Sequence, residues 1–239
     1  MMRIMVETTL PRIERGTLAE KATGALLDFI RSHHMQPGSM LPPEARLAEL
    51  LGVSRPVVRE ALRGLRGLGV ISVLNGRGAV VRELDSSTLE VFFAHALQTI
   101  DNSARDLMEL RRAIEGQTAM LAAERRSDEQ AATIAGFVEG MRTELDNPAV
   151  YSKLDAQFHV AIAVASGNVL FHHFVHSIQS ALEDVSLRGL RRRTERRSLQ
   201  QVQQLHERIA DSIVRRAPAE AGIAMNEHMA AASKVLLGG

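Results

Sequence analysis

Three histidines and one aspartate stand on the apolar faces of three stretches with helical spacing. Asp155 and His159 are four residues apart in LDAQFHVAI, so both side chains project from one face of a helix. His206 and His228 each lie within an apolar stripe farther along the chain. Three neutral imidazoles and a carboxylate are a suitable ligand set for Zn²⁺ or a similar divalent ion. The alternative for each histidine alone is a hydrogen-bonded core residue, the commoner role on an apolar face.

A second pair, His172 and His176 in LFHHFVHSI, has the same spacing but a different orientation. The apolar stripe of that stretch runs through Leu170, Phe174 and Ile178, two positions away from the histidines. An offset of two residues turns a side chain by about 200° around a helix. We therefore expect both histidines to be solvated.

One arginine of the stretch DLMELRRAIEGQ points partly inward. Arg111 shares a helix face with Leu107 and Ile114. A buried guanidinium needs an anion. The stretch itself offers Glu115, four residues farther along the same helix, as the partner.

The front third of the chain places arginine side chains at the start of a predicted helix. EARLAELLGVSRPVVREALRGL predicts a short helix ended by Gly52, a tight turn, and a second helix capped by the Ser54 hydroxyl. Pro56 falls in the first turn, where its missing N–H is no loss. Arg55 and Arg59 share a face at this helix start, and arginine can form bidentate bonds to guanine. Such a helix end enters the major groove in a helix-turn-helix. The alternative is ordinary helix packing, with the arginines paired to carboxylates or solvent.

A hairpin is expected directly after these helices. VISVLNGRGAVV is rich in Val and Ile around Asn75-Gly76, a pair typical of type I′ turns. It predicts strands at about 70–74 and 78–82. The hairpin would form a wing, with Asn75, Gly76 and Arg77 near the minor groove or the DNA backbone.

The rest of the chain predicts only helices. Seven stretches have helical periodicity, at roughly 88–99, 103–126, 128–145, 148–165, 169–187, 197–215 and 218–236. Because only 3% of residues are aromatic, their packing must rest on aliphatic side chains and Met. The fold class is therefore mostly α, a winged helix-turn-helix domain followed by an all-α bundle of about seven helices.

Composition excludes several classes of protein. The 239 residues include no Cys, which excludes disulfides and thiolate metal sites. No apolar run approaches the roughly 20 residues of a membrane span, and no secretory signal opens the chain. Basic residues outnumber acidic ones in the front third, and the reverse holds behind it, which favours a polyanionic partner for the front. We expect a cytoplasmic protein with no membrane partner.

The front third also resembles a known family. GSMLPPEARLAELLGVSRPVVREALRGLRGLGVI, followed by NGRGAVV, resembles the winged-helix domain of the GntR family of bacterial transcription regulators, over residues 17–84. The resemblance implies contacts to double-stranded DNA through Ser54, Arg55, Arg59 and the wing tip. Where the family often has a DNA-contacting arginine after the Glu of LPPE, this chain has Ala45. Arg46 next to it is a candidate replacement, although one residue turns a helical side chain by about 100°.

The back of the chain resembles a domain that follows this winged helix in the FadR subfamily. The motif Asp155-x-x-Phe158-His159, His206 in LHERIADSI and His228 in MNEHM resemble the metal-binding version of the FCD ligand domain, over about residues 88–236. The resemblance implies that these four polar residues bind a divalent metal, zinc, with nickel or manganese as alternatives. It also implies that Arg111 binds the carboxylate of a small organic acid effector, such as a hydroxy or sugar acid.

Together these predictions describe a ligand-controlled repressor rather than an enzyme. The expected organisation is an N-terminal arm at 1–16, a winged helix-turn-helix domain at 17–84, and an FCD effector-binding and dimerisation domain at 85–239. We expect a homodimer that binds a palindromic operator. One alternative is a metallohydrolase-like helical domain, which lacks an evident general base and leaves the front domain unexplained. The other is a regulator whose metal is purely structural.

Overall fold

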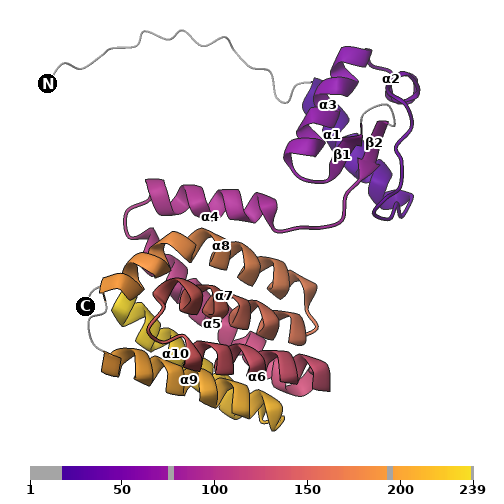
Figure 1. Cartoon of the computed structure of the whole chain (residues 1–239). Helices are drawn as coiled ribbons and strands as arrows, with labels where there is room; N and C mark the ends of the chain where they lie inside the picture. The colour runs from indigo at the N-terminus through magenta and orange to yellow at the C-terminus, as the bar shows by residue number, and fades with distance from the viewer. Residues whose placement is uncertain (1–17, 75–77, 193–195, 238–239) are drawn as a thin grey trace, which may run out of the picture. The chain divides into compact units, whose positions relative to one another are not determined.

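The computed structural model describes residues 18–74, 78–192 and 196–237 (Figure 1). The chain divides into two compact units, Met1–Asp85 and Ser86–Gly239, each with its own hydrophobic core. Helix is the main element of both units, and the one sheet among the described residues is a two-stranded hairpin. This is the mostly helical fold that the sequence predicts.

The front unit consists of three helices and a hairpin. They are α1 (Leu18–Ser32), α2 (Glu44–Leu51), α3 (Arg55–Gly67), β1 (Ile71–Leu74) and β2 (Gly78–Val81). The antiparallel strands pair Ile71 with Val81 and Leu74 with Gly78. Fully buried aliphatic side chains from α1, α2 and α3, among them Leu26, Leu47 and Leu65, form the core against the hairpin. The helix-turn-helix and the hairpin that the sequence predicts are confirmed, with the hairpin bounds within one residue of those predicted.

The turn between α2 and α3 follows the predicted chemistry with one exception. Gly52 has a φ of 63°, the left-handed conformation that favours glycine after a helix. Ser54 is the extended N-cap residue of α3, but its side chain makes no capping hydrogen bond, so that detail of the prediction is wrong. Because Pro56 occupies the second position of α3, one of the two N–H groups that a capping hydroxyl can accept from is missing.

The back unit is a bundle of seven described helices. They are α4 (Ser87–Thr99), α5 (Ser103–Arg125), α6 (Asp128–Thr143), α7 (Pro148–Ala165), α8 (Val169–Arg192), α9 (Arg196–Val214) and α10 (Pro218–Leu237). Each agrees with a predicted helix, and α8 extends past its predicted end at 187. Among the described residues, no helix is both long and apolar enough to cross a bilayer.

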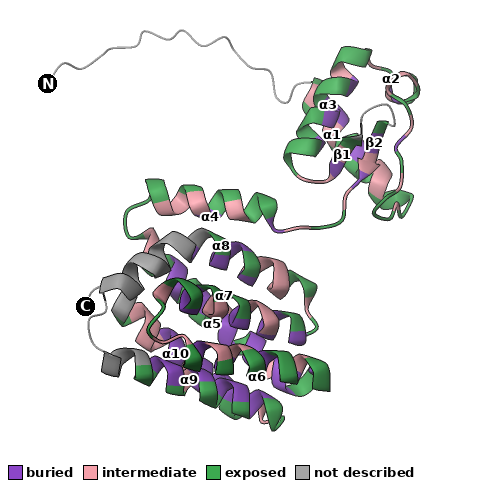
Figure 2. Cartoon of the chain, in the orientation of Figure 1, coloured by how far each residue is buried: buried purple, intermediate pink, exposed green. Residues whose placement is uncertain are grey.

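Four helices of the bundle meet in its interior. α5 packs against α7, α9 and α10, and α7 also contacts α6 and α8. Gly222 allows α10 to approach α5 closely, since a Cβ there would lie 2.7 Å from the Cγ atom of Met120. Figure 2 shows the buried residues on the inward sides of these helices and the exposed ones on the outward sides. Polar residues on the inward sides of α5, α7, α9 and α10 therefore come together in the core.

Candidate functional site

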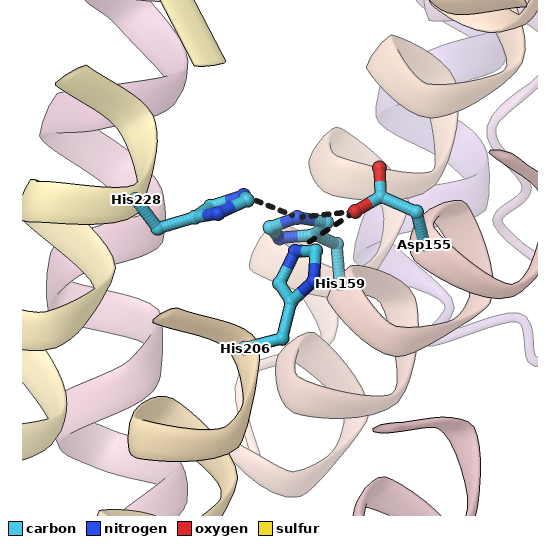
Figure 3. Close-up of side chains that lie close together, drawn as sticks. All are labelled: Asp155, His159, His206 and His228. Atoms are coloured by element: carbon cyan, nitrogen blue, oxygen red, sulfur yellow. Dashed lines mark hydrogen bonds and ion pairs between the residues drawn. The ribbon is translucent and has the colours of Figure 1, made fainter. Parts of the chain in front are cut away.

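The four residues predicted as metal ligands converge in the core of the bundle. Asp155 and His159 come from α7, His206 from α9 and His228 from α10, and Figure 3 shows their side chains pointing toward one another. One donor atom of each lies within 4.8 Å of the others. The Nε2 atom of His206 is 2.9 Å from Oδ1 of Asp155, and the Nε2 atoms of His228 and His159 are 3.2 Å apart. The structure thus brings the predicted set together, and metal binding itself stays a prediction.

Helical periodicity explains why these residues meet. Asp155 and His159 are one helical turn apart on α7, so their side chains lie one above the other. His206 precedes the fully buried Ile209 and Ile213 by three and seven residues, and therefore takes a core position on α9. The three imidazoles are almost fully buried, at 0 to 3% exposure.

Two of the imidazoles have polar partners behind them. The Nδ1 atom of His159 lies 2.5 Å from Oε2 of Glu115, and the Nδ1 atom of His206 lies 3.3 Å from the hydroxyl of Tyr151. A partner at Nδ1 fixes the ring and leaves Nε2 available to bind a metal. The Nδ1 atom of His228 is buried and has no hydrogen-bond partner within the described part of the chain.

The electrostatics of the cluster favour a bound cation. Burial raises the pKa of Asp155, but the hydrogen bond with His206 and attraction to the neighbouring histidines outweigh it and lower the pKa overall. Burial likewise raises the pKa of Glu115, and the charges of Arg111 and His159 lower it to about 2 in net. Burial, with repulsion from the other two histidines, lowers the pKa of His228 well below 6.5. Both carboxylates are therefore charged at neutral pH, and His228 is neutral.

The donor set fits a divalent metal ion. The Nε2 atoms of His159 and His228 lie 3.2 Å apart, and Nε2 of His206 lies 2.9 Å from Oδ1 of Asp155, so one cation among these atoms could replace both hydrogen bonds. Three imidazoles and a carboxylate supply the nitrogen and oxygen ligands that zinc, nickel and manganese accept. Four protein ligands complete a tetrahedral zinc, whereas a five- or six-coordinate ion keeps positions for oxygens of another molecule.

Arg111 is buried beside this cluster and already has an anion. Its Nε atom donates to Oε1 of Glu115 at 2.6 Å, which is the pairing that the sequence offers. The side chain of Arg111 is only 5% exposed. Its Nη2 atom is buried and shows no hydrogen-bond partner among the residues that the structure describes. Arg111 therefore anchors Glu115 and still has a donor to offer.

A cavity connects the cluster with the outside of the bundle. It has a volume of about 480 Å³, lies between α6, α7 and α8, and is lined by Asp155, Lys153 and Gln179, among others. The side chain of Asp155 is 26% exposed, in contrast to the buried histidines. Asp155 is thus the face of the cluster that a molecule in the cavity would meet, and Lys153 places a positive charge in its wall.

The predicted DNA-reading residues lie on the surface of α3. Ser54 and Arg55 are exposed, and the side chain of Arg59 is 58% exposed. Nε of Arg59 donates to Oε2 of Glu44, at the start of α2, over 2.7 Å. The arginines are therefore not part of the packing between the helices. The structure leaves open whether they contact DNA.

The other predicted DNA contacts are only partly described. Arg46 is exposed on α2 and pairs with Glu49 on the same helix over 3.0 Å. Asn75, Gly76 and Arg77 at the wing tip lie outside the described residues. For Arg46 and the wing tip, DNA contact stays a prediction.

His172 and His176 take no part in the metal cluster. His176 is exposed, and its Nδ1 atom lies 3.2 Å from Oε1 of Glu90 on α4, whereas His172 is half-buried, so solvation is confirmed for His176 alone. Leu170, assigned to the core stripe of this helix, is 64% exposed, and that assignment is wrong. The reason is its place in the first turn of α8, where neighbouring Val169 is exposed as well.

Two residues of the site were not assigned to it from the sequence. Glu115 was identified only as a partner for Arg111, and its contact with His159 depends on how α5 packs against α7. Tyr151, the only tyrosine of the chain, precedes Asp155 by one helical turn. That spacing was a usable signal, because it places the hydroxyl on the same face as the ligands.

Comparison with known proteins agrees with both units. The family description "Bacterial regulatory proteins, gntR family" matches residues 18–81, and "FCD domain" matches residues 106–231. The HTH-type transcriptional regulator LutR of Bacillus subtilis (strain 168) is 30% identical over 213 residues, which cover 88% of this chain and 97% of that protein. The Glc operon transcriptional activator of Escherichia coli (strain K12) is 29% identical over 231 residues, with coverages of 93% and 90%.

A solved structure agrees as well. Streptococcus agalactiae GntR superimposes with a TM-score of 0.67 and 25% sequence identity, covering 90% of this chain and 99% of that one. The family and these relatives are transcription regulators and not enzymes, in line with the prediction from the sequence. The chain therefore belongs to the GntR family of bacterial transcription regulators and carries an FCD domain behind its DNA-binding domain.

Proposed function

We propose that a small organic acid, bound at a divalent metal ion inside the helical bundle, controls how this regulator binds its operator. The observation that carries the proposal is the convergence of Asp155, His159, His206 and His228 within 4.8 Å, in the same chain as a winged helix. The cluster is buried, charged and preorganised by Glu115 and Tyr151. A hydrophobic core has no need of these groups for stability alone.

The surroundings of the cluster favour an acid as the effector. A carboxylate can accept from the unpaired Nη2 atom of Arg111, while its oxygens, or a neighbouring hydroxyl, complete the coordination of the metal. The cavity that reaches Asp155 offers a way in, and Lys153 in its wall attracts anions. A hydroxy or sugar acid supplies both kinds of oxygen.

A thermal-shift screen of such acids tests this proposal. With metal present, the effector should raise the melting temperature of the wild type, because a ligand that binds only the native state stabilises it by mass action. Arg111→Met should abolish the shift, and Arg112→Met, at the exposed neighbouring position, should retain it. The proposal would be wrong if no acid shifts the melting temperature of the metal-loaded protein.

A metal with a purely structural role is the second candidate. It is favoured by the four protein ligands, which are enough to complete a tetrahedral zinc. The two roles differ after chelation at a temperature where the protein stays folded. A chelated sample that still releases DNA in response to the effector assigns the metal to structure, whereas loss of the response assigns it to sensing.

On the DNA side, we propose a homodimer whose two α3 helices read the halves of a palindromic operator. Because Glu44 occupies the Nε atom of Arg59, the two Nη groups remain for an end-on bidentate contact with guanine. Dimer mass in solution and a symmetric footprint would support this arrangement; a monomer bound to one half-site would contradict it.

A reporter assay distinguishes repression from activation. Repression is the prediction from the sequence, and one relative is named an activator. A reporter under the operator should be expressed more strongly when the chain is deleted, and lower expression on deletion would assign activation.

A further inference from the structure

A groove runs between α3 and the β1–β2 hairpin of the front unit. It has a volume of about 270 Å³, and the side chains of Arg59, Arg63 and Arg66 line it from α3. Among the described residues, Glu44 is the one carboxylate in the lining. The groove therefore contains a surplus of positive charge, and two of its arginines have no place in the DNA contacts described above.

The three arginines differ in what already holds them. Arg59 is bound by Glu44 across the groove over 2.7 Å. Arg63 pairs with Glu60 one turn earlier on α3, but both side chains are more than half exposed, so this ion pair contributes little. Arg66 is exposed and has no ion pair within the described residues. Arg63 and Arg66 are therefore available to an incoming anion.

The shape of the groove favours close approach by a phosphate. Arg59, Arg63 and Arg66 follow one another at spacings of four and three residues, so they form a row along one face of α3. The opposite wall contains Gly78, whose φ of 87° is one that L side chains rarely adopt. A Cβ at Gly78 would meet nothing within 4 Å, so the space beside it is open.

We propose that this groove binds a phosphate of the DNA backbone, with Arg63 and Arg66 as its ligands. Arg59, which is paired with Glu44, contacts the bases instead. The inference rests on the proposed entry of α3 into the major groove and adds a contact that carries no sequence information. Such a phosphate contact would add the same affinity for every duplex, whatever its sequence. Added salt would weaken this contribution, because the contact releases counterions from the DNA.

Binding of the full chain to a labelled random-sequence duplex tests the inference without knowledge of the operator. Affinity is measured by fluorescence anisotropy over about 50–200 mM salt. Arg66→Ala should reduce the slope of log K against log salt by roughly 0.9, the value for one phosphate contact. Arg66→Lys, which keeps the charge, should retain the wild-type slope. Because the side chain is exposed, neither change should alter the melting temperature.

Arg142→Ala is the matched control. Arg142 is exposed and pairs with Glu139 three residues before it, as Arg63 does with Glu60, but it lies on α6 of the bundle. This variant should keep the wild-type slope. A slope that Arg66→Ala leaves unchanged, while the wild type binds DNA with strong salt dependence, overturns the inference.

Two further results separate this inference from its neighbours. A wild type that shows no salt-dependent binding to any duplex contradicts the proposed DNA binding itself. Stabilisation of wild type but not of Arg66→Ala by inorganic phosphate alone, with equal DNA slopes for the two, would assign the groove to a free anion and overturn the DNA contact.

Discussion

Replacing Glu115 by glutamine separates the two tasks of its carboxylate. Oε1 accepts from Arg111 at 2.6 Å, and Oε2 lies 2.5 Å from Nδ1 of His159. Glutamine has nearly the same shape but no charge, so it leaves the guanidinium buried without an anion. It also presents a weaker acceptor, or a donor, to the imidazole behind a predicted metal ligand.

The lowered pKa of Glu115 gives the size of the first effect, and general experience with metal sites gives that of the second. A pKa of about 2 for Glu115, against an ordinary 4.5, corresponds to roughly 3 kcal/mol by which folding favours the charged carboxylate. Glutamine forfeits this contribution, which should lower the melting temperature of the bundle by about 6–12 °C. Loss of an outer partner typically weakens metal binding by about 10- to 100-fold. The stability loss should appear in the apo protein, and the affinity loss should come in addition.

The assay is metal affinity by competition with a chelator, together with thermal unfolding of the chelated protein. Glu109→Gln, on the exposed side of the same helix, should leave both values at wild type. If Glu115→Gln is too unstable to study, Glu115→Asp keeps the charge for Arg111 while drawing the carboxylate back from His159. Wild-type metal affinity in either folded variant would refute the role of Glu115 behind the imidazole.

Three further outcomes are expected. His206→Ala should strip the metal, as measured by elemental analysis of purified protein, and full metal content would contradict its role as a ligand. The chelated protein should lose stability as pH falls below about 6.5, because His228 takes up a proton in the unfolded state but not in the native state, where its pKa is lowered. Denaturant titrations across that range measure the loss. His228→Asn should reduce the slope of the free energy of unfolding against pH. Arg59→Ala should lose about 1–3 kcal/mol of discrimination between operator and mutated operator, and an unchanged footprint would count against base reading.

Periodicity and turn chemistry were enough to predict the elements of this fold. Gly52 marked the turn between α2 and α3, and apolar residues at helical spacing marked the helices of the bundle. Boundaries were less accurate at the end of α8, where the helix continues through Gly189, two residues past the predicted end. The Ser54 hydroxyl forms no cap, although Pro56 in the first turn removes only one of the two N–H groups that it could accept from.

The convergence of the four predicted ligands could be anticipated because each of these residues departs from the apolar pattern of its own helix. Asp155 and His228 can each be found without knowing how α7 and α10 pack. Contacts between helices were not predictable in this way. The approach of Glu115 to His159 depends on the rotation of α5 about its axis, which a single helical stripe leaves uncertain by about one residue, or about 100°.

Because Arg111 already pairs with the carboxylate of Glu115, it has no need of an effector carboxylate to balance its charge. A buried ion pair is, however, a poor way to stabilise a core, because the cost of removing both charges from water offsets most of their attraction. Apolar side chains of similar volume would serve stability equally well. What the pair supplies instead is position: it aims a carboxylate at His159 and leaves Nη2 of Arg111 as a buried donor beside the predicted metal ligands. The same contact that satisfies the arginine therefore leaves it suited to the effector carboxylate proposed above.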